Sequence, residues 1–315
     1  MNIMITGCAG FIGSHAVEEF LAAGYNIAGV DSLTYAGDPD NMLSFIDDIE
    51  FYHLDICDTV KITNIVNNLD IEWIINFAAE THVDNSIKSS DSFIHSNVKG
   101  VASLLDACRA TNAKLFHIST DEVYGSTDYG SFSEIDALDP QNPYSATKAA
   151  SELLIKSYNN THGVEYLMVR PCNNFGPRQN NEKFMPTILT KLLQNEKIPI
   201  YGDGKNIRDW LYVKENVSAI RYILENSQLG EVYNISTSNE KTNIEIVSNL
   251  CTLMSRDAAD SIMYVDDRLG HDFRYSIYNK KLRDLGFFER MELKSFRSNL
   301  DKTVVFYTER SNEKA

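Results

Sequence analysis

The 315-residue sequence predicts an α/β fold in which a doubly wound parallel sheet is followed by a smaller C-terminal domain. Two observations predict the sheet. Short apolar runs alternate with helical patterns through the first half of the chain, which is typical of βαβ units. A glycine-rich loop joins the first apolar run to the first helical pattern. The third observation is the length of the chain, which together with 43% hydrophobic residues predicts more core than one compact domain holds.

The first half of the chain supplies the elements of the sheet. Apolar runs predict strands at 2–6, 26–31, 50–54, 72–77, 114–119 and 165–171. Amphipathic spacing predicts helices at 11–24, 60–69, 92–110 and 143–160. Pro143 stands at a favourable first position of the last of these helices. Because strands and helices alternate at this spacing, we expect the strands to be parallel.

The second half of the chain has a different composition. Residues 171–186 are rich in Pro, Asn and Gly and predict a long ordered loop. Strands are expected at 198–202 and 231–236, and a Thr-x-x-Glu capping box predicts a helix over 242–254. The last dozen residues are charged, and we expect them to fray.

These elements predict a division into two domains. The first comprises residues 1–171, and the stretch 210–236 returns to it. The second comprises residues 172–209 and 237–315. We expect it to be a small domain that covers the first like a lid.

The composition excludes several classes of function. The formal net charge is −15 and no run of Lys or Arg is present, so we expect neither nucleic acid nor a membrane surface as a partner. No apolar run approaches the roughly 20 residues that span a bilayer. The five cysteines are scattered without the spacing of a metal site, and no signal peptide is recognised. We therefore expect no metal, and reduced thiols in a cytoplasmic protein.

A glycine loop predicts a dinucleotide site. Gly7, Gly10 and Gly13 follow the first strand and open the first helix, where glycines let the backbone approach a pyrophosphate at the helix N-terminus. An ordinary glycine-rich turn is the alternative. Asp31 at the end of the second strand makes the dinucleotide the better interpretation, because an acid there binds ribose hydroxyls and favours NAD over NADP. The domain is therefore expected to be Rossmann-like.

Tyr144 and Lys148 form a second candidate pair. They stand four residues apart and so lie on one face of the predicted helix. A surface pair is the alternative, since the chain has 16 tyrosines. Close to a nicotinamide cation and an ammonium group, the pKa of a phenol falls. The phenolate can then remove a hydroxyl proton while hydride leaves the same carbon.

Asp121 and Glu122 directly follow the apolar strand 114–119. Two neighbouring carboxylates at the end of a buried strand are costly to bury unless they have a function. One alternative is a capping box of Ser119 and Glu122, but the residues that follow predict a loop and no helix to cap. The other alternative is a solvated acidic turn.

These and further stretches resemble one known family. The glycine loop with the Tyr144/Lys148 pair is similar to the extended short-chain dehydrogenase/reductases. Within them, the chain resembles the dTDP-glucose 4,6-dehydratases in the stretches DSLTYAG (31–37), AAETHVDNSI (78–87), STDEVYG (119–125), PYSATKAAS (143–151), NNFGP (173–177), RDWLYV (208–213) and GHDFRY (270–275). The resemblance implies an NAD-dependent hydro-lyase of deoxysugar biosynthesis. Its substrate would be a nucleoside-diphosphate hexose, with dTDP-glucose as the first choice, and its product the 4-keto-6-deoxy sugar.

The resemblance also implies catalytic roles. Tyr144, with Lys148 beside it, would take the C4 hydroxyl proton while NAD⁺ takes the C4 hydride. The resulting ketone acidifies the C5–H, which Glu122 would remove, and Asp121 would protonate the C6 hydroxyl so that it leaves as water. The hydride would then return to C6, and Thr120 would bond to the C4 oxygen. A shared site can split two carboxyl pKa values as an elimination requires.

Binding residues follow from the same resemblance. The implied cofactor contacts are Gly7, Gly10, Phe11, Ile12, Gly13, Asp31, Ser32, Leu33, Thr34, Asp55, Ile56, Ala78, Ala79, Ser96, Tyr144, Lys148 and Asn174. The implied substrate contacts are Thr81, Thr120, Asn173, Lys183, Phe184, Pro199, Tyr201, Arg208, Asn243, Asp267, Arg268 and His271. Arg208 would bind the diphosphate, because a guanidinium group matches phosphate oxygens. An exposed ion pair with Asp209 is the alternative for this arginine.

Some positions depart from the family pattern and leave alternatives open. Leu269 stands where proline is usual, Arg178 and residues 180–181 replace aromatic or Phe-Pro residues, and the segment 126–142 is short. These changes surround the predicted nucleotide pocket, so UDP-glucose is an alternative substrate. A 4-epimerase or decarboxylase on the same scaffold, and a cofactor-sensing regulator without catalysis, are further alternatives. The resemblance also implies a homodimer that pairs helices 92–110 and 143–160 of each subunit.

Overall fold

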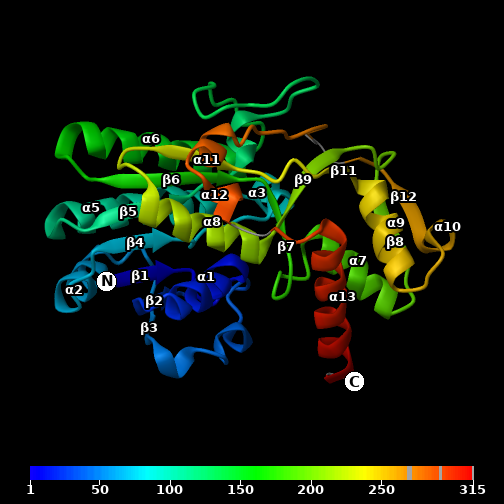
Figure 1. Ribbon diagram of the computed structural model, residues 1–315, viewed down its shortest axis with the longest axis horizontal. Coiled ribbons are helices and arrows are strands. Elements are labelled where there is room, and N and C mark those ends of the chain that lie inside the picture. Colours follow the sequence, from blue (N-terminus) through cyan, green and yellow to red (C-terminus); the bar gives the residue numbers. More distant parts are fainter. Residues whose placement is uncertain (268–271, 291–292, 314–315) are drawn as a thin grey trace.

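The main body of the protein is a seven-stranded parallel sheet (Figure 1). The computed structural model describes residues 1–267, 272–290 and 293–313. Strand order across the sheet is β10-β6-β5-β4-β1-β2-β3, so the order reverses between β4 and β1. Such a reversal opens the crevice in which doubly wound sheets bind ligands. The strands are β1 (Asn2–Thr6), β2 (Asn26–Asp31), β3 (Glu50–His53), β4 (Trp73–Asn76), β5 (Lys114–Ile118), β6 (Tyr166–Pro171) and β10 (Val232–Ile235).

Helices cover both faces of this sheet. The helices α1 (Phe11–Ala22) and α8 (Val213–Asn226) pack together on one face and bury one apolar cluster against the strands. On the other face, α2 (Thr59–Asn68), α5 (Val101–Thr111) and α6 (Pro143–His162) bury a second cluster. Because both faces are covered, most side chains of the central strands are apolar, as in parallel strands of such folds. The predicted fold class is therefore confirmed.

The predicted helix over 92–110 is not one regular helix. It comprises α4 (Asp91–Phe93), a π-helical segment (Ile94–Gly100) and α5. Asn97, in the π-helical segment, is 1% exposed and donates from Nδ2 to Glu80 O at 3.0 Å and to Thr147 Oγ1 at 3.0 Å. A π-helical turn changes the face that each residue presents. Here it lets Asn97 link α6, through Thr147, to the residues that follow β4, through Glu80.

A second body of structure lies beside the carboxyl ends of the main strands (Figure 1). One small sheet has the order β11-β9-β7 and another pairs β12 with β8. With three helices they enclose a separate apolar cluster. The elements are β7 (Asn173–Phe175), β8 (Ile198–Tyr201), β9 (Ile207–Tyr212), β11 (Glu240–Thr242), β12 (Ile262–Val265), α7 (Phe184–Leu193), α9 (Asn243–Leu253) and α13 (Phe296–Glu313). The shorter helices of the chain are α3 (Val83–Lys88), α10 (Ala258–Ser261), α11 (Lys280–Asp284) and α12 (Phe287–Arg290).

Two expectations for the second half are wrong. The stretch 171–186 is not only a loop, because it contains β7 and the start of α7. The C-terminal residues through Glu313 do not fray, because they form the end of α13. Leu300, Thr303 and Tyr307 lie on one helical face and are buried, although charged residues surround them in the sequence. No helix in the described ranges is long and apolar enough to cross a membrane.

Candidate active site

Three adjoining cavities form one groove above the carboxyl ends of the main strands. We name them after one lining residue each: the Asp31 cavity of about 80 Å³, the Tyr144 cavity of about 250 Å³ and the Arg208 cavity of about 310 Å³. The first two share the lining residues Gly7, Gly10, Ala36, Phe77 and Ala79. The last two share Thr81, Glu122, Asn173, Glu182 and Lys183. The groove is therefore continuous from β2 to the second body of structure.

The predicted cofactor residues gather in two of these cavities. All of them except Leu33 line the Asp31 or the Tyr144 cavity. Leu33 lies beside them, because its N–H donates to Asp31 Oδ1 at 2.8 Å. Their roles as contacts stay predictions.

The glycine loop leaves room only for backbone. Gly7 has a φ of +71°, and a Cβ atom there would lie 2.7 Å from Ala78 N. At Gly13 a Cβ atom would lie 2.0 Å from Gly7 O. Helix α1 begins after Gly10 without a side-chain cap, so its first N–H groups point at the groove. This cradle fits a pyrophosphate at a helix N-terminus.

Asp31 is held in place by backbone. Its Oδ2 accepts a hydrogen bond from Ala9 N–H at 2.9 Å and its Oδ1 accepts one from Leu33 N–H. Burial raises the pKa of this carboxyl, and the two backbone bonds oppose the rise. The remaining acceptor capacity of the two oxygens suits ribose hydroxyls, whereas a phosphate on the ribose would meet a carboxylate. The residues therefore fit NAD better than NADP.

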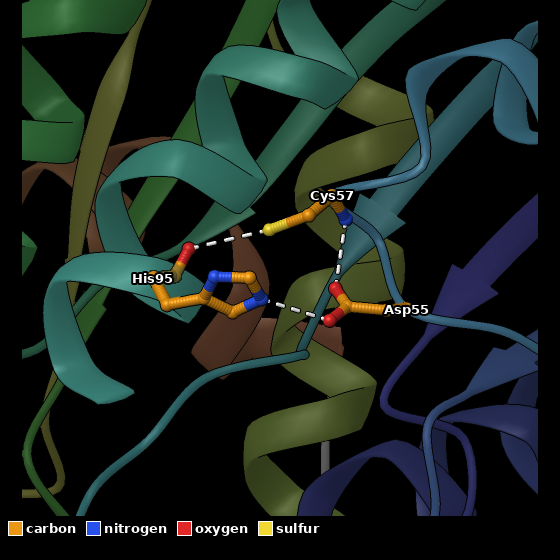
Figure 2. Close-up of side chains that lie close together, drawn as sticks. All are labelled: Asp55, Cys57 and His95. Carbon is orange, nitrogen blue, oxygen red and sulfur yellow. Dashed lines mark hydrogen bonds and ion pairs between the residues drawn. The ribbon is translucent and has the colours of Figure 1, made fainter. Parts of the chain in front are cut away.

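Asp55, which lines the Asp31 cavity, lies close to Cys57 and His95 (Figure 2). Their potential ligand atoms lie within 4.8 Å of one another. Among the described residues, this is the one group of His, Cys, Asp or Glu side chains that could bind a metal ion. His95 Nε2 bonds to Asp55 Oδ2 at 2.9 Å, and Cys57 N–H donates to Asp55 Oδ1 at 2.8 Å. Both carboxylate oxygens are thus already engaged. The contacts orient Asp55 at the mouth of the groove.

Tyr144 and Lys148 both line the Tyr144 cavity and are buried in the first turns of α6. Asn142 caps this helix through a capping box with Ser145, which fixes where the helix begins. Lys148 Nζ donates to Ile118 O at 2.7 Å, and burial lowers the pKa of Lys148 to about 8. Burial raises the pKa of Tyr144, as do the carboxylates of Glu122 and Asp121. The pKa of Tyr144 is therefore raised in the protein without cofactor, even though Lys148 lies on the same face of α6.

Asp121 is a buried carboxyl in the same cavity. It is 3% exposed, and its Oδ2 has no hydrogen-bond partner among the described residues. Thr120 Oγ1 donates to Asp121 Oδ1 at 3.3 Å. Burial raises the pKa of Asp121 well above its usual range, and the neighbouring Glu122 raises it further. Burial therefore favours the protonated form of Asp121, which lines the groove, and the interpretation as a solvated turn is wrong for it.

No helix follows the acidic pair over residues 125–142, as expected, but the pair itself opens a short turn. Residues Asp121–Tyr124 form a short 3₁₀ turn. Its cap is Thr120, whose Oγ1 accepts from Glu122 N–H at 3.3 Å. Ser119 does not cap this turn, because its hydroxyl donates to Glu152 at 2.6 Å. The Glu122 side chain is therefore left for the groove, where it lines both the Tyr144 and the Arg208 cavity.

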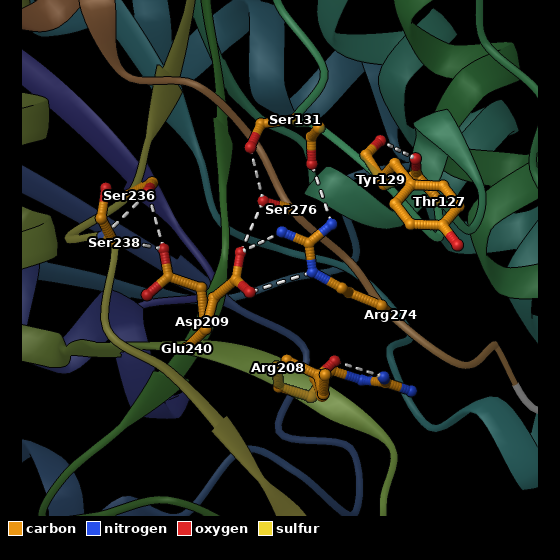
Figure 3. A network of polar contacts seen from close by, with 12 residues as sticks. Thr127, Tyr129, Ser131, Arg208, Asp209, Ser236, Ser238, Glu240, Arg274 and Ser276 are labelled. Atoms are coloured by element: carbon orange, nitrogen blue, oxygen red, sulfur yellow. Dashed lines mark hydrogen bonds and ion pairs between the residues drawn. The ribbon is translucent and has the colours of Figure 1, made fainter.

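Glu122 also meets a residue from far along the chain. Its Oε2 lies 3.5 Å from the hydroxyl of Tyr275 and accepts from Asn142 Nδ2 at 3.4 Å. The Tyr275 hydroxyl also donates to Asp272 Oδ2. A network holds this segment in place: Arg274 bonds to Glu240 at 2.7 Å and 2.9 Å, and Ser276 donates to Glu240 at 2.6 Å (Figure 3).

Arg208 lies over the ring of Tyr275 with its guanidinium carbon 4.2 Å from the ring centroid. It lines the Arg208 cavity and donates to Asp272 O at 2.9 Å. The neighbouring Asp209 is 2% exposed and accepts from Ser236 Oγ at 2.6 Å (Figure 3). Because both Arg208 and Asp209 are buried, the alternative of an exposed ion pair is wrong.

Most predicted substrate residues also gather. The Arg208 cavity is lined by Thr81, Asn173, Lys183, Phe184, Pro199, Tyr201, Arg208 and Asn243. Thr120 lines the Tyr144 cavity. Asp267 lines none of the three cavities; its carboxylate lies beside Gly202 instead. Arg268 and His271 lie outside the described residues.

Lys183 adds a second cation at the junction of the two cavities. Its Nζ donates to Thr81 O at 2.8 Å. Burial lowers the pKa of Lys183, although the carboxylates of Glu182 and Glu122 favour its charged form. The groove thus places Arg208 and Lys183 where an anionic ligand would neutralise them.

Residues that sequence reasoning missed support the site from below. Glu152 and Arg170 form a fully buried ion pair at 2.5 Å, and Arg170 Nη1 donates to the Tyr124 hydroxyl at 2.5 Å. His117 lies 3.3 Å from Lys148 Nζ. Because His117 stands inside the apolar strand 114–119, the sequence did indicate that it is buried. Tyr275 ends the family-like stretch GHDFRY, but its contact with Glu122 was not predictable, because the two residues are 153 positions apart.

Comparisons with known proteins agree with this geometry. The family model described as GDP-mannose 4,6 dehydratase matches residues 4–298. The low-salt glycan biosynthesis protein Agl12 of Haloferax volcanii is 42% identical over 311 residues, which cover 98% of each chain. The dTDP-glucose 4,6-dehydratase of an Actinoplanes species is 40% identical over 318 residues, again 98% of each chain. The crystal structure of DesIV, a dTDP-glucose 4,6-dehydratase from Streptomyces venezuelae with NAD bound, has a TM-score of 0.95 at 38% identity and covers 99% of this chain and 98% of that one.

Proposed function

Because the chain belongs to the NAD-dependent nucleotide-sugar 4,6-dehydratases of the extended short-chain dehydrogenase/reductase family, we propose that it converts dTDP-glucose into the 4-keto-6-deoxy sugar. The observation that carries this proposal is the acidic pair. Asp121 is a buried acid of raised pKa, Glu122 is beside it, and both line the groove that holds Tyr144 and the glycine loop. An elimination needs an acid and a base on neighbouring carbons, and this pair supplies them.

The cofactor would be held by backbone and by Asp31. The N–H groups that follow Gly10 would bind the pyrophosphate, and the Asp31 carboxylate would accept hydrogen bonds from the ribose hydroxyls. NAD supplies a hydride acceptor for C4 of the sugar and later a hydride donor for C6. Because the hydride leaves and returns, the protein should turn over without added cofactor.

The elimination would move three protons. Tyr144 takes the proton of the C4 hydroxyl, and Thr120 bonds to the oxygen that remains. Glu122 removes the proton from C5 as general base, which breaks the C5–H bond and forms the C5–C6 double bond. Asp121 gives its proton to the C6 hydroxyl, so that water leaves. When hydride comes back to C6, Glu122 would return its proton to C5, and the proton held by Tyr144 would make up for the one that Asp121 gave. The assignment of acid and base between the two carboxyls is supported by burial, which raises the pKa of Asp121 and so favours its protonated form.

The nucleotide would lie in the Arg208 cavity. Arg208 and Lys183 supply positive charge for the diphosphate in an otherwise acidic protein. Pro199 and Tyr201 of β8 form a wall on which a base and ribose can pack. UDP-glucose is the second candidate substrate, because the sequence departs from the family pattern at Arg178, residues 180–181 and Leu269. Among the described residues, Arg178 pairs with Glu18, outside the Arg208 cavity.

A 4-epimerase is the second candidate activity. It needs Tyr144 and the cofactor but neither an acid nor a base at C5 and C6. The depth at which Asp121 is buried disfavours this activity, because a buried carboxyl without a task costs free energy. A cofactor-sensing regulator without catalysis is disfavoured by the same pair.

We also propose how the chain is organised. Residues 1–171, with 210–236, would hold the cofactor, and residues 172–209 with 237–315 would hold the nucleotide sugar. Two chains would pair through the segments 92–110 and 143–160, which carry the exposed apolar side chains of Ile94 and Leu153. The protein would work in the cytoplasm, where its five cysteines stay reduced.

The deciding experiment offers dTDP-glucose and UDP-glucose in parallel to the purified protein without added NAD. A product lighter by one water, carrying a 4-keto group, is expected from dTDP-glucose. Glu122→Gln should lose activity by about 10²- to 10⁴-fold, the range for a general base, whereas the exposed Glu165→Gln should match the natural protein. Absence of this product from both sugars would overturn the proposal.

A further inference from the structure

A row of buried polar side chains crosses the main sheet beneath the groove. The registers of β1, β4 and β5 place Thr6 opposite Asn76 and Asn76 opposite His117. Thr6 and His117 are 0% exposed and Asn76 is 1% exposed. The row begins beside Gly7 and ends at Lys148, whose Nζ lies 3.3 Å from His117 Nε2. A polar chain this deep in a sheet must satisfy its hydrogen bonds internally.

The distances fix the direction of these hydrogen bonds. Thr6 Oγ1 lies 2.6 Å from Asn76 Oδ1, which is the length of an O–H···O bond rather than an N–H···O bond. Thr6 Oγ1 also accepts from Ala78 N–H at 3.4 Å, so its own hydrogen is free to go to Asn76. The oxygen of Asn76 therefore faces Thr6, and its Nδ2 donates to His117 Nδ1 at 3.1 Å. A neutral imidazole that accepts at Nδ1 carries its hydrogen on Nε2.

Ser151 supports the same arrangement from the other side. Its hydroxyl donates to Lys148 O at 2.6 Å, so its lone pairs face His117 Nε2 at 3.1 Å. An Nε2–H group therefore has an acceptor in Ser151. The opposite tautomer would leave Nδ1–H facing the Nδ2 donor of Asn76.

We propose that Thr6 and Asn76 lock the tautomer of His117, so that His117 is a positioning residue that presents an N–H group, rather than a lone pair, to the amine of Lys148. This inference rests on the proposed function only in giving Lys148 a catalytic task. The tautomer itself follows from the register of three strands.

The locked tautomer disfavours the ammonium form of Lys148. The one hydrogen on Nε2 is shared between Ser151 Oγ at 3.1 Å and Lys148 Nζ at 3.3 Å, so Nε2 offers Lys148 no lone pair. This disfavours an ammonium group and suits a neutral amine that donates one N–H to Ile118 O. Glu152 on α6 favours the charged form of Lys148 but is itself neutralised by Arg170 of β6. Burial lowers the pKa of His117 well below its usual range, and a charge on Lys148 lowers it further, so the neutral imidazole is favoured in either state of Lys148.

The first test reads the tautomer directly. In protein labelled with ¹⁵N-histidine, NMR distinguishes the protonated ring nitrogen from the bare one, and His117→Gln identifies the signals of His117 among those of the seven histidines. The expected result is hydrogen on Nε2, unchanged from about pH 6 to about pH 9, on either side of the usual imidazole pKa. Hydrogen on Nδ1, or protonation of the ring within this range, would overturn the proposal.

The second test reverses the lock. Asn76→Asp replaces the Nδ2 donor by an acceptor, so His117 should move its hydrogen to Nδ1 and turn a lone pair towards Lys148. The pKa of Lys148, followed by the ¹³Cε signal of labelled lysine, should then rise by about 1 to 3 units. Asn41→Asp is the matched control, because Asn41 is also buried but donates to Ala9 O, outside the row. An unchanged tautomer in Asn76→Asp contradicts the lock.

A third variant tests the lock independently, in case Asn76→Asp does not fold. Thr6→Val keeps the shape of the side chain but removes the hydroxyl that orients Asn76, so both tautomers of His117 should appear. A single Nε2–H tautomer in this variant would overturn the role of Thr6. Turnover of dTDP-glucose is not used in these tests, so the proposed function and this inference can fail separately.

Discussion

Glu152→Gln is expected to be among the most destabilising single changes in the main domain. Glu152 and Arg170 are 0% and 1% exposed, and three contacts of 2.5 to 3.2 Å join them. Ser119 adds a fourth hydrogen bond to the same carboxylate at 2.6 Å. The amide removes the charge that pairs with Arg170 and turns one acceptor into a donor that faces another donor. Breaking a buried pair in this way costs about 3–5 kcal/mol.

Such a loss is a large part of the stability of an ordinary domain, which is about 5–15 kcal/mol. Urea unfolding followed by circular dichroism measures it, without ligand and at neutral pH. The matched control is Glu165→Gln, which removes an ion pair with Lys114 whose side chains are 50% and 35% exposed. Because solvent screens that pair, its loss should cost about 1 kcal/mol or less. If Glu152→Gln costs no more than the control, the buried pair does not support the active-site strand.

Three further changes test other parts of the site. Gly13→Ala should abolish copurification of NAD, because the new Cβ atom would lie 2.0 Å from Gly7 O, whereas Gly10→Ala, with its nearest atom at 3.2 Å, should retain some. The raised pKa of Asp121 means that its neutral form is favoured on folding, so the free energy of unfolding should fall as pH rises above about 3.8, and Asp121→Asn should remove that slope in urea titrations. The activity that needs Asp121 as an acid should likewise fall at high pH, when the carboxyl loses its proton. Tyr275→Phe should lower kcat with little change in KM, because it loses the hydroxyl near Glu122 but keeps the ring under Arg208; an increase in KM alone would contradict this.

Local pattern was enough for the main sheet. The bounds of β1 and β2 agree with the predicted strands, because each is a short apolar run between turn residues. The start of α6 follows from Pro143 and the cap at Asn142. In the same way, Thr242 with Glu245 forms the predicted capping box at the start of α9.

Features that depend on distant contacts were not predictable. Most residues of α13 are polar or charged in the sequence. The burial of Tyr307 depends on packing in the second body and on the bond of its hydroxyl to Gln179 O. The π-helical segment around Asn97 depends on bonds to Glu80 and Thr147.

The candidate site shows the same division. The motifs located the acidic pair, the glycine loop and the Tyr144/Lys148 pair, because each is contiguous or has helical spacing. The sequence could not show that Asp121 alone of the acidic pair is deeply buried, since that depends on the cover provided by other elements. Glu152 also escaped, because a glutamate in an amphipathic helix is ordinarily exposed.

The most direct measurement of the central claim follows one hydrogen atom. dTDP-glucose with deuterium at C4 is converted by the purified protein without added NAD, and the product is examined by NMR. If water leaves between the two transfers of hydride, the deuterium appears at C6 of the 4-keto-6-deoxy sugar. Deuterium that remains at C4 of a sugar with its oxygen at C6, or that is lost to free NADH, would contradict the account.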